Sequence, residues 1–116
     1  MRDINNYEVF KKAHSLTLKI YDITKNYPKE EQFGLALQMR RAAYLIPMNL
    51  KEGGIGNEVE FFRYVRIAIG SKEELEYQIL LSKDLGYISE KIYKYIVNYV
   101  PCTCKFWNLL RILKQN

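Results

Sequence analysis

The sequence predicts an all-α protein: an up-down-up-down antiparallel four-helix bundle that forms a single domain over residues 1–116. Two sequence patterns support this prediction. Apolar residues recur with helical periodicity, mostly three or four residues apart, in four segments, as in helices that bury one face, and no segment alternates like a strand. The chain has 116 residues, of which 48% are hydrophobic and 27% charged, which suits one core and one domain.

The first helix is predicted from a row of apolar residues that ends just before a proline. Its members are Val9, Ala13, Leu16, Ile20, Ile23 and Tyr27. Because a proline disfavours the helical conformation of the residue before it, this helix should stop before Pro28.

The second helix is predicted after the segment PKEEQFG and contains a proline. Its apolar face comprises Leu35, Met39, Ala42, Ile46 and Leu50. Pro47 lies inside this pattern, and because the apolar period resumes after it, we expect a kink at Pro47 rather than an end. Three glycines within EGGIGNE, residues 52–58, predict the turn to the third helix, since glycine disfavours helix.

The last two helices are predicted from capping residues and two further apolar rows. Asn57 should cap the third helix, and Gly86 should lie just beyond its end, before Ser89 caps the fourth helix. The apolar row of the third helix comprises Phe61, Phe62, Val65, Ala68, Ile69, Leu75 and Ile79. Gly70 interrupts this row and predicts a point where another helix crosses closely. The apolar row of the fourth helix comprises Ile92, Ile96, Tyr99, Thr103, Phe106, Leu110 and Leu113, with Pro101 as a candidate bend.

Several motifs in the second and third segments resemble the 23S rRNA intervening-sequence protein family. They are Arg40-Arg-Ala-Ala, Ile46-Pro-Met-Asn-Leu-Lys-Glu-Gly, Phe61-Phe-Arg-Tyr-Val-Arg-Ile-Ala-Ile-Gly-Ser, Glu74-Leu-Glu and Lys83-Asp-Leu-Gly-Tyr. The motif positions that we expect to be structural are Pro47, Asn49, Glu52, Gly53, Arg63, Gly70, Glu74 and Gly86. The chain departs from the family pattern at Leu45, Met48 and Lys51, so the interactions of family serines at the kink are not expected.

The resemblance implies a small bacterial four-helix bundle whose biochemical role is unsettled. The family is also similar in fold to the accessory variability protein of diversity-generating retroelements, a basic, barrel-shaped pentamer that binds a reverse transcriptase and nucleic acid. A homo-oligomer, and specifically a homopentamer, is therefore an expectation from this resemblance and not from composition.

Positive charge is concentrated in the fourth predicted helix. The net charge is +5, and the isoelectric point near 9.2 allows an anionic partner such as nucleic acid. The cations of this helix are Lys91, Lys94, Lys105, Arg111 and Lys114, with Glu90 as its single acid and Tyr93, Tyr95 and Tyr99 between them. Lysines can neutralise phosphates and tyrosine rings can stack on unpaired bases, so these cations are candidate RNA-binding residues.

The structural alternative for this helix is a solvated basic face. Glu90 and Lys94 are spaced as a favourable surface ion pair, and Tyr99 belongs to the apolar row. Arg40 and Arg41 form a second basic point beside Pro47. Either they contact phosphate, or one of them is partly buried and pairs with a carboxylate; the candidate partners are Glu52, Glu74 and Glu76.

The sequence offers little for catalysis or for metal binding. His14 is the only histidine, and the Glu-x-x-His motifs of di-iron bundles are absent, although Glu73, Glu74, Glu76 and Asp84 provide carboxylates. Cys102 and Cys104 are two residues apart, and on one helix their side chains diverge, so we expect reduced structural thiols. We predict no enzymatic activity, no cofactor, no metal and no small-molecule substrate.

Two hypotheses follow for function. The first is a cytoplasmic module that binds RNA or a nucleoprotein; the second is an oligomeric protein-interaction scaffold without nucleic-acid contact. The chain has no apolar stretch long enough for a membrane span, and its first residues do not resemble a signal peptide. Salt dependence separates the hypotheses, because binding to phosphates weakens steeply as salt rises.

Overall fold

The computed structural model describes residues 2–115, and the side chains of residues 2–112. All regular elements in this part of the chain are helical. They are the short 3₁₀ turns η1 (Ile4–Asn6) and η2 (Lys29–Glu31) and the α-helices α1 (Glu8–Thr24), α2 (Leu35–Gly54), α3 (Glu58–Asp84), α4 (Glu90–Val97) and α5 (Thr103–Gln115). The prediction of an all-α protein is confirmed.

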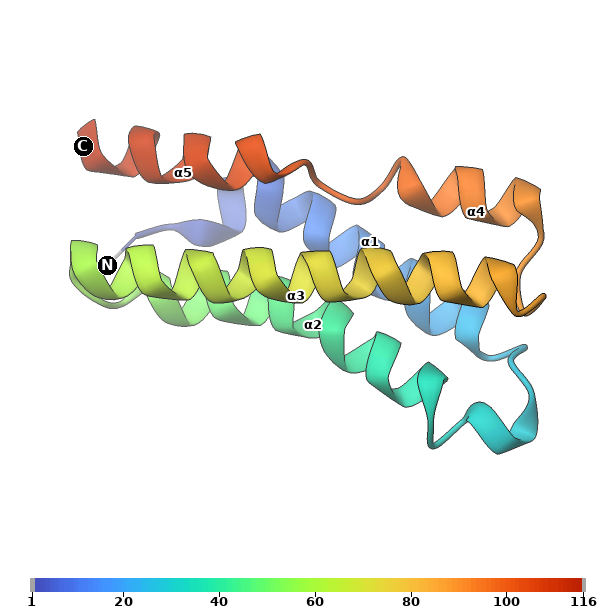
Figure 1. The fold of residues 1–116 in the computed structure, drawn as a ribbon. Helices are drawn as coiled ribbons and strands as arrows, with labels where there is room; N and C mark the ends of the chain where they lie inside the picture. Colours follow the sequence, from blue (N-terminus) through green and yellow to red (C-terminus); the bar gives the residue numbers. More distant parts are fainter. Residues whose placement is uncertain (1, 116) are drawn as a thin grey trace.

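The helices lie around one elongated core. α2 and α3 lie side by side, α1 packs against α2, and α5 and α4 follow one another along the other side of α3 (Figure 1). The core joins buried side chains of all five α-helices, including Leu16, Met39, Leu75, Ile96 and Phe106. α3 is therefore the central element that connects α2 to the two C-terminal helices.

The local signals for helix ends are confirmed. The Asn57 side chain accepts a hydrogen bond from the backbone N–H of Glu60 at 2.9 Å, and Ser89 accepts one from Ile92 at 3.1 Å. Gly86 has a φ of +82°, the left-handed conformation that glycine adopts most readily after a helix. α1 ends at Thr24, before the last predicted apolar position, although Tyr27 is still buried.

The turn predicted over residues 52–58 is shorter than expected, because α2 continues through Gly53 and Gly54. Both glycines are buried against neighbours. A Cβ atom on Gly53 would lie 2.7 Å from Cβ of Tyr64, and one on Gly54 would lie 2.6 Å from Cγ1 of Ile4. These glycines therefore serve close packing of α2 against α3 and η1 rather than breaking the helix.

Pro47 is buried inside α2, and the helix continues past it as predicted. Because proline has no backbone N–H, the carbonyl of Ala43 loses its helical partner. The hydroxyl of Thr17 in α1 lies 3.1 Å from this carbonyl oxygen and 2.9 Å from that of Ala13, so its single proton is shared between them. Thr17 thereby satisfies the carbonyl that Pro47 leaves free, and the kink at Pro47 stays a prediction.

The prediction of a helix crossing at Gly70 is wrong for the isolated chain. Gly70 is exposed on α3, and a Cβ atom added there would meet nothing within 4 Å. The sequence shows that position 70 has no side chain. It does not show on which side of this helix the other helices pack. The close approaches occur instead at Gly53 and Gly54.

The fourth predicted helix is two helices, so the described chain has five α-helices rather than four. α4 ends at Val97 and α5 begins at Thr103. Pro101 lies in the intervening segment and is buried. Proline restricts Val100 to extended conformations and donates no helical hydrogen bond, so here it separates two helices rather than bending one.

The two cysteines form a disulfide, which contradicts the expected free thiols. Cys102 and Cys104 are bonded, with a Cα–Cα distance of 5.4 Å. The expectation assumed that both residues lie on one helix, whereas Cys102 precedes α5. Outside a regular helix, the two side chains can turn toward each other.

Candidate nucleic-acid interface

The start of α5 is attached to α3 by a buried lysine. Lys72 is only 4% exposed, and its ammonium lies 2.9 Å from Oε1 of Glu73 and 2.8 Å from Oε1 of Glu76. It also donates a hydrogen bond of 2.7 Å to the hydroxyl of Thr103. Lys72 therefore links two carboxylates of α3 to the first residue of α5.

The cluster shifts the acid–base equilibria of its members. Burial lowers the pKa of Lys72, but hydrogen bonds to Glu76 and Glu73 and the attraction of their charges outweigh burial and raise this pKa above its usual value. The hydrogen bond and charge of Lys72 lower the pKa of the Glu73 carboxyl. The charged form of the cluster is thus favoured at neutral pH.

Sequence reasoning missed Lys72, although a signal was present. Lys72 occupies the position between Ala68 and Leu75 in the apolar row of α3, where a hydrophobic residue is expected. Glutamates follow it one and four residues later, and the spacing of four places Lys72 and Glu76 as neighbours on a helix surface. A lysine on the buried face with two nearby acids could have predicted this cluster.

The predicted cations of α4 point into solvent. Lys91 and Lys94 are both exposed, while Ile96 anchors the helix in the core. The expected pair between Glu90 and Lys94 is not among the ion pairs of the described side chains; Glu90 lies 3.9 Å from the ammonium of Lys83 in α3 instead. Lys91 and Lys94 therefore remain available to an external anion.

The tyrosines of this region make contacts within the chain. The ammonium of Lys83 lies 4.4 Å from the ring centre of Tyr93, and that of Lys19 lies 4.1 Å from the ring centre of Tyr99. The rings of Tyr95 and Tyr99 are 5.0 Å apart. Two of the three predicted stacking rings thus already contact a cation, and Tyr95, which is 49% exposed, is the most open of the three.

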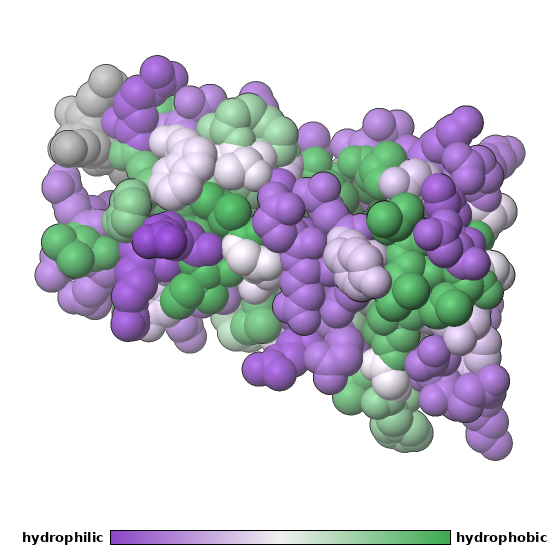
Figure 2. Space-filling model, viewed as in Figure 1, coloured by the Kyte–Doolittle hydropathy of each residue, from purple (hydrophilic) through white to green (hydrophobic). Residues whose placement is uncertain are grey.

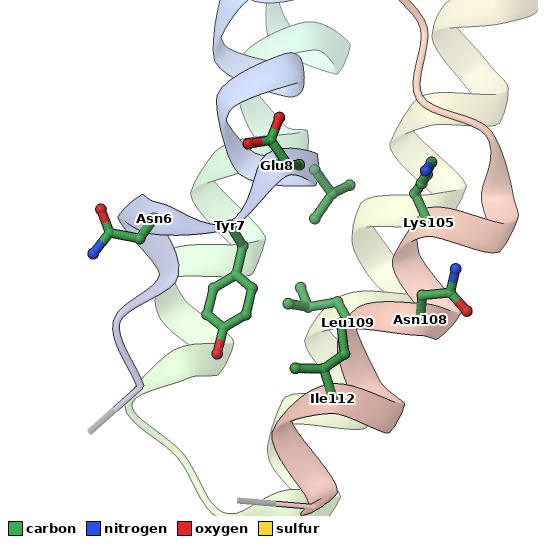
Figure 3. Close-up of a pocket in the computed structure, with 8 residues that line it drawn as sticks. Asn6, Tyr7, Glu8, Lys105, Asn108, Leu109 and Ile112 are labelled. Carbon is green, nitrogen blue, oxygen red and sulfur yellow. The ribbon is translucent and has the colours of Figure 1, made fainter.

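One of the predicted cations of α5, Lys105, lies beside a groove. Lys105 and Arg111 are exposed, whereas the side chain of Lys114 lies outside the described residues. Lys105 lines a groove of about 310 Å³, in which Tyr7 from the N-terminal segment faces Leu109 and Ile112 of α5 (Figure 3). The same lysine also lines a neighbouring hollow of about 250 Å³ together with Glu8, Val9, Lys12 and Pro101.

The sequence model of the 23S rRNA-intervening sequence proteins matches residues 5–107, which is most of the chain. The chain belongs to the 23S rRNA-intervening sequence protein family. The crystal structure of a protein with unknown function from the S23 ribosomal protein family of Bacteroides thetaiotaomicron is similar in fold. The TM-score is 0.74 and the identity 23%, over 90% of this chain and 96% of the other. No curated protein matches the chain at a significant level.

The family motif residue Arg40 makes hydrogen bonds within the fold, but its partners are not the expected carboxylates. Arg40 is half-buried and donates hydrogen bonds to the Thr24 hydroxyl at 2.8 Å and to Oε1 of Gln32 at 3.1 Å. Its guanidinium also lies 5.7 Å from the ring centre of Tyr21. The predicted carboxylate partner is therefore wrong, because neutral groups at the α1–α2 connection accept from Arg40. Its neighbour Arg41 is exposed.

The other motif positions divide into buried and exposed residues. Asn49 is buried, and its amide donates to the carbonyl of Leu45 at 2.6 Å. Arg63 is exposed and lies 5.3 Å from the ring centre of Tyr64. Glu52 and Glu74 are exposed and take part in none of the ion pairs that the described side chains form.

Arg40 and Arg41 lie on α2, which is not packed against α4 or α5, so the two predicted basic regions are separate.

The histidine and two of the acids considered for catalysis or metal binding make other contacts in the structure. In that part of the chain, no group of three or more histidine, cysteine, aspartate or glutamate side chains could hold a metal ion. His14 is exposed and stacks on Phe10, with ring centres 6.5 Å apart. Of the acids considered for catalysis, Glu73 and Glu76 bind Lys72. None of the described helices is long and apolar enough to cross a membrane.

Proposed function

We propose that this protein is a non-enzymatic, self-assembling basic module that binds RNA or a nucleoprotein in the cytoplasm through the outer surface of α4 and α5. One observation carries the proposal. Lys91, Lys94, Lys105 and Arg111 are all exposed on α4 and α5, the two helices that follow one another along α3, and none belongs to an ion pair between described side chains. The family name, which refers to 23S rRNA, and the name of the S23 ribosomal protein family support the choice of RNA.

The binding mode that fits this surface is contact with the phosphate backbone. Exposed lysines and arginines release counterions when they neutralise phosphates, and this binding does not depend on sequence. Stacking on bases is a smaller contribution here, because the rings of Tyr93 and Tyr99 contact lysines of the same chain. Shape or structure of the RNA is therefore a better candidate for specificity than base identity.

Self-assembly is supported by apolar side chains on the surface. Phe33 is 90% exposed, Val59 78% and Ile55 71%, and Figure 2 shows separate apolar areas on one face of the molecule. Large exposed apolar areas are typical of interaction sites. We propose a homo-oligomer, a pentamer by family resemblance, built from bundles in up-down-up-down order in which α4 and α5 together replace the predicted fourth helix and α2 is kinked at Pro47.

The decisive experiment measures binding of fluorescent structured and single-stranded RNA between about 50 and 200 mM salt, where counterion release has a large effect. We expect binding that weakens steeply with salt and is lost in the variant Lys91→Glu/Lys94→Glu. The matched control Lys25→Glu/Lys29→Glu changes the net charge equally at exposed positions outside α4 and α5. It should bind RNA nearly as well as the native chain, because the charges of α4 are intact.

The same series distinguishes the scaffold hypothesis. Absence of RNA binding at the lowest salt, together with an oligomer that persists at high salt, would replace the proposal with a protein-interaction scaffold. Equal losses in both charge-reversal variants would assign binding to the overall charge rather than to α4. Size-exclusion chromatography with light scattering at each salt concentration provides the oligomeric state.

A further inference from the structure

The disulfide between Cys102 and Cys104 lies at the surface, at the start of α5. Both cysteines are exposed, so a small molecule can reach the bridge. Thr103, the residue between them, is fixed by the hydrogen bond from buried Lys72. The bridge is thus accessible while the backbone inside it is anchored to α3.

This disulfide contributes little to holding the fold together. A disulfide stabilises mainly by restricting the unfolded chain, and the effect grows with the length of the closed loop. Here only one residue lies between the two cysteines, so the loop is as short as a non-adjacent pair allows. α5 is held instead by the core residues Phe106 and Leu109 and by the contact between Lys72 and Thr103. Exposed disulfides without a structural role are typically the reducible ones.

The surroundings favour a negatively charged thiol. Lys105 follows Cys104 directly and lines the hollow of about 250 Å³ with Lys12 and Pro101, the residue before Cys102. Glu8 also lines this hollow, so two cations and one anion surround it. Lys72 and Glu73 contact Thr103 on the side of α3. A small anionic molecule that approaches the bridge is attracted by exposed Lys105, the residue next to Cys104, and by the net charge of +5 of the whole chain.

We propose that Cys102 and Cys104 form a thiol–disulfide exchange site for an anionic low-molecular-weight thiol of the glutathione type. The thiolate of the first molecule attacks one cysteine sulfur, the S–S bond breaks, and the departing cysteine thiolate takes up a proton. The product is a mixed disulfide on the protein. A second thiolate attacks the sulfur of the bound thiol, the small-molecule disulfide leaves, and the second cysteine is protonated. The two thiols are oxidised as the protein disulfide is reduced by two electrons.

The first test measures exchange on the native chain. The oxidised protein is incubated with reduced glutathione without denaturant, quenched with a maleimide and weighed by mass spectrometry. We expect two maleimides per chain, and reversal of this labelling when oxidised glutathione is added. Labelling that requires denaturant, or two thiols that stay free in oxidised glutathione, would overturn the proposal.

Single-cysteine variants show whether the mixed disulfide forms. In Cys102→Ser and in Cys104→Ser the remaining cysteine has no partner within the chain, so oxidised glutathione should leave one glutathione bound to it. The double variant Cys102→Ser/Cys104→Ser should gain no mass. It should also keep the helical circular dichroism of the native chain, because the bridge is not a structural support. Absence of glutathione on both single variants would contradict accessible exchange.

The role of charge is tested with two thiols. Lys105→Glu should slow reduction by glutathione severalfold and reduction by 2-mercaptoethanol much less, because both attack as thiolates but the carboxylates of glutathione give its thiolate the larger negative charge. Lys25→Glu is the matched control, since it alters the net charge equally at an exposed position in another part of the chain. Equal rates of Lys105→Glu and native protein with both thiols would refute selectivity for an anionic thiol.

Discussion

α2 and the segment that contains α4 and α5 differ in helix continuity, and the difference is the opposite of what their numbers of prolines and glycines predict. α2 includes Pro47, Gly53 and Gly54 and is continuous from Leu35 to Gly54. The segment from α4 to α5 includes Pro101 and no glycine, yet it is interrupted between Val97 and Thr103. The helix with more unfavourable residues is therefore the unbroken one.

Packing explains the difference. α2 has α1 on one side and α3 on the other, and each of its unfavourable residues meets a matching neighbour. Thr17 satisfies the carbonyl freed by Pro47, and the absence of side chains at Gly53 and Gly54 admits Tyr64 and Ile4. Intrinsic helix propensity is a weak influence when tertiary contacts reward the helix. The following substitutions test this explanation, from the largest expected effect to the smallest.

Gly53→Ala should destabilise the protein by about 1–3 kcal/mol, the typical effect of an overpacked core. The new methyl group would lie 2.7 Å from Cβ of Tyr64, which the backbone of α3 holds in place. Urea denaturation followed by circular dichroism gives the free energy of unfolding. An alanine that stabilises at this position would show that Gly53 is not a packing residue.

Thr17→Val should destabilise by about 1–2 kcal/mol, because the carbonyl of Ala43 loses its only side-chain donor while the side-chain shape is nearly kept. In the background of Pro47→Ala, an N–H is again available to this carbonyl, and the same substitution should have a smaller effect. A double-mutant cycle measures the coupling. Additive effects of the two substitutions would contradict the proposed relation between Thr17 and Pro47.

Gly70→Ala should stabilise the isolated chain by about 0.5–1 kcal/mol, since alanine is a better helix former and the added methyl group meets no atom of the same chain. It is the matched control for Gly53→Ala, because both place the same residue within a helix. Thermal unfolding of both variants at low protein concentration makes the comparison. A loss of stability that grows with protein concentration would indicate that a second copy approaches Gly70.

Acid should loosen α5 before α2, because α5 is attached to α3 through the ion-paired cluster of Lys72, whereas no ion pair of the described side chains involves α2. The pKa of Glu73 is lowered in the folded state, so its stabilising contribution is present above its unfolded pKa and is lost as the pH falls through the folded value. Lys72 has a raised pKa, so its contribution is lost only as the pH rises above about 10.5. Between these limits the contribution is constant.

Hydrogen exchange at successively lower pH measures this order of loosening. Amides at the start of α5 should lose protection at a higher pH than those of α2. The variant Glu73→Gln should remove part of this acid sensitivity, because a neutral amide does not titrate. Equal loss of protection in both helices, after correction for the intrinsic pH dependence of exchange, would exclude a separate role for the cluster.

The parts of the fold that sequence predicts well depend on neighbours in the chain. Asn57, Ser89 and Gly86 act on backbone groups only a few residues away, and their positions were sufficient to locate helix ends. Gly70 and Gly53 could not be distinguished, because the role of a glycine in a helix depends on what approaches it from elsewhere. The same limit applies to Pro101 and Pro47.

For the candidate interface, the sequence predicted which residues are exposed but not which residues contact one another. Exposure of Lys91 and Lys94 follows from their place opposite the apolar row, whereas contact with RNA stays a prediction. The neutral partners of Arg40 could not be found from charge pairing, since Thr24 and Gln32 come together with it only in the folded chain. Lys72, in contrast, could have been predicted from the sequence, because it is a charged residue at a position on the buried face of its helix.

The hydroxyl of Thr17 has a consequence for how related sequences can vary. The carbonyl at position 43 lacks a helical donor only in sequences that have proline at position 47. Only in these sequences is there selection for a hydrogen-bond donor at position 17. Relatives that replace this proline should be free to carry valine or alanine at the aligned position of α1. The two positions, 30 residues apart in the chain, should therefore be inherited as a pair.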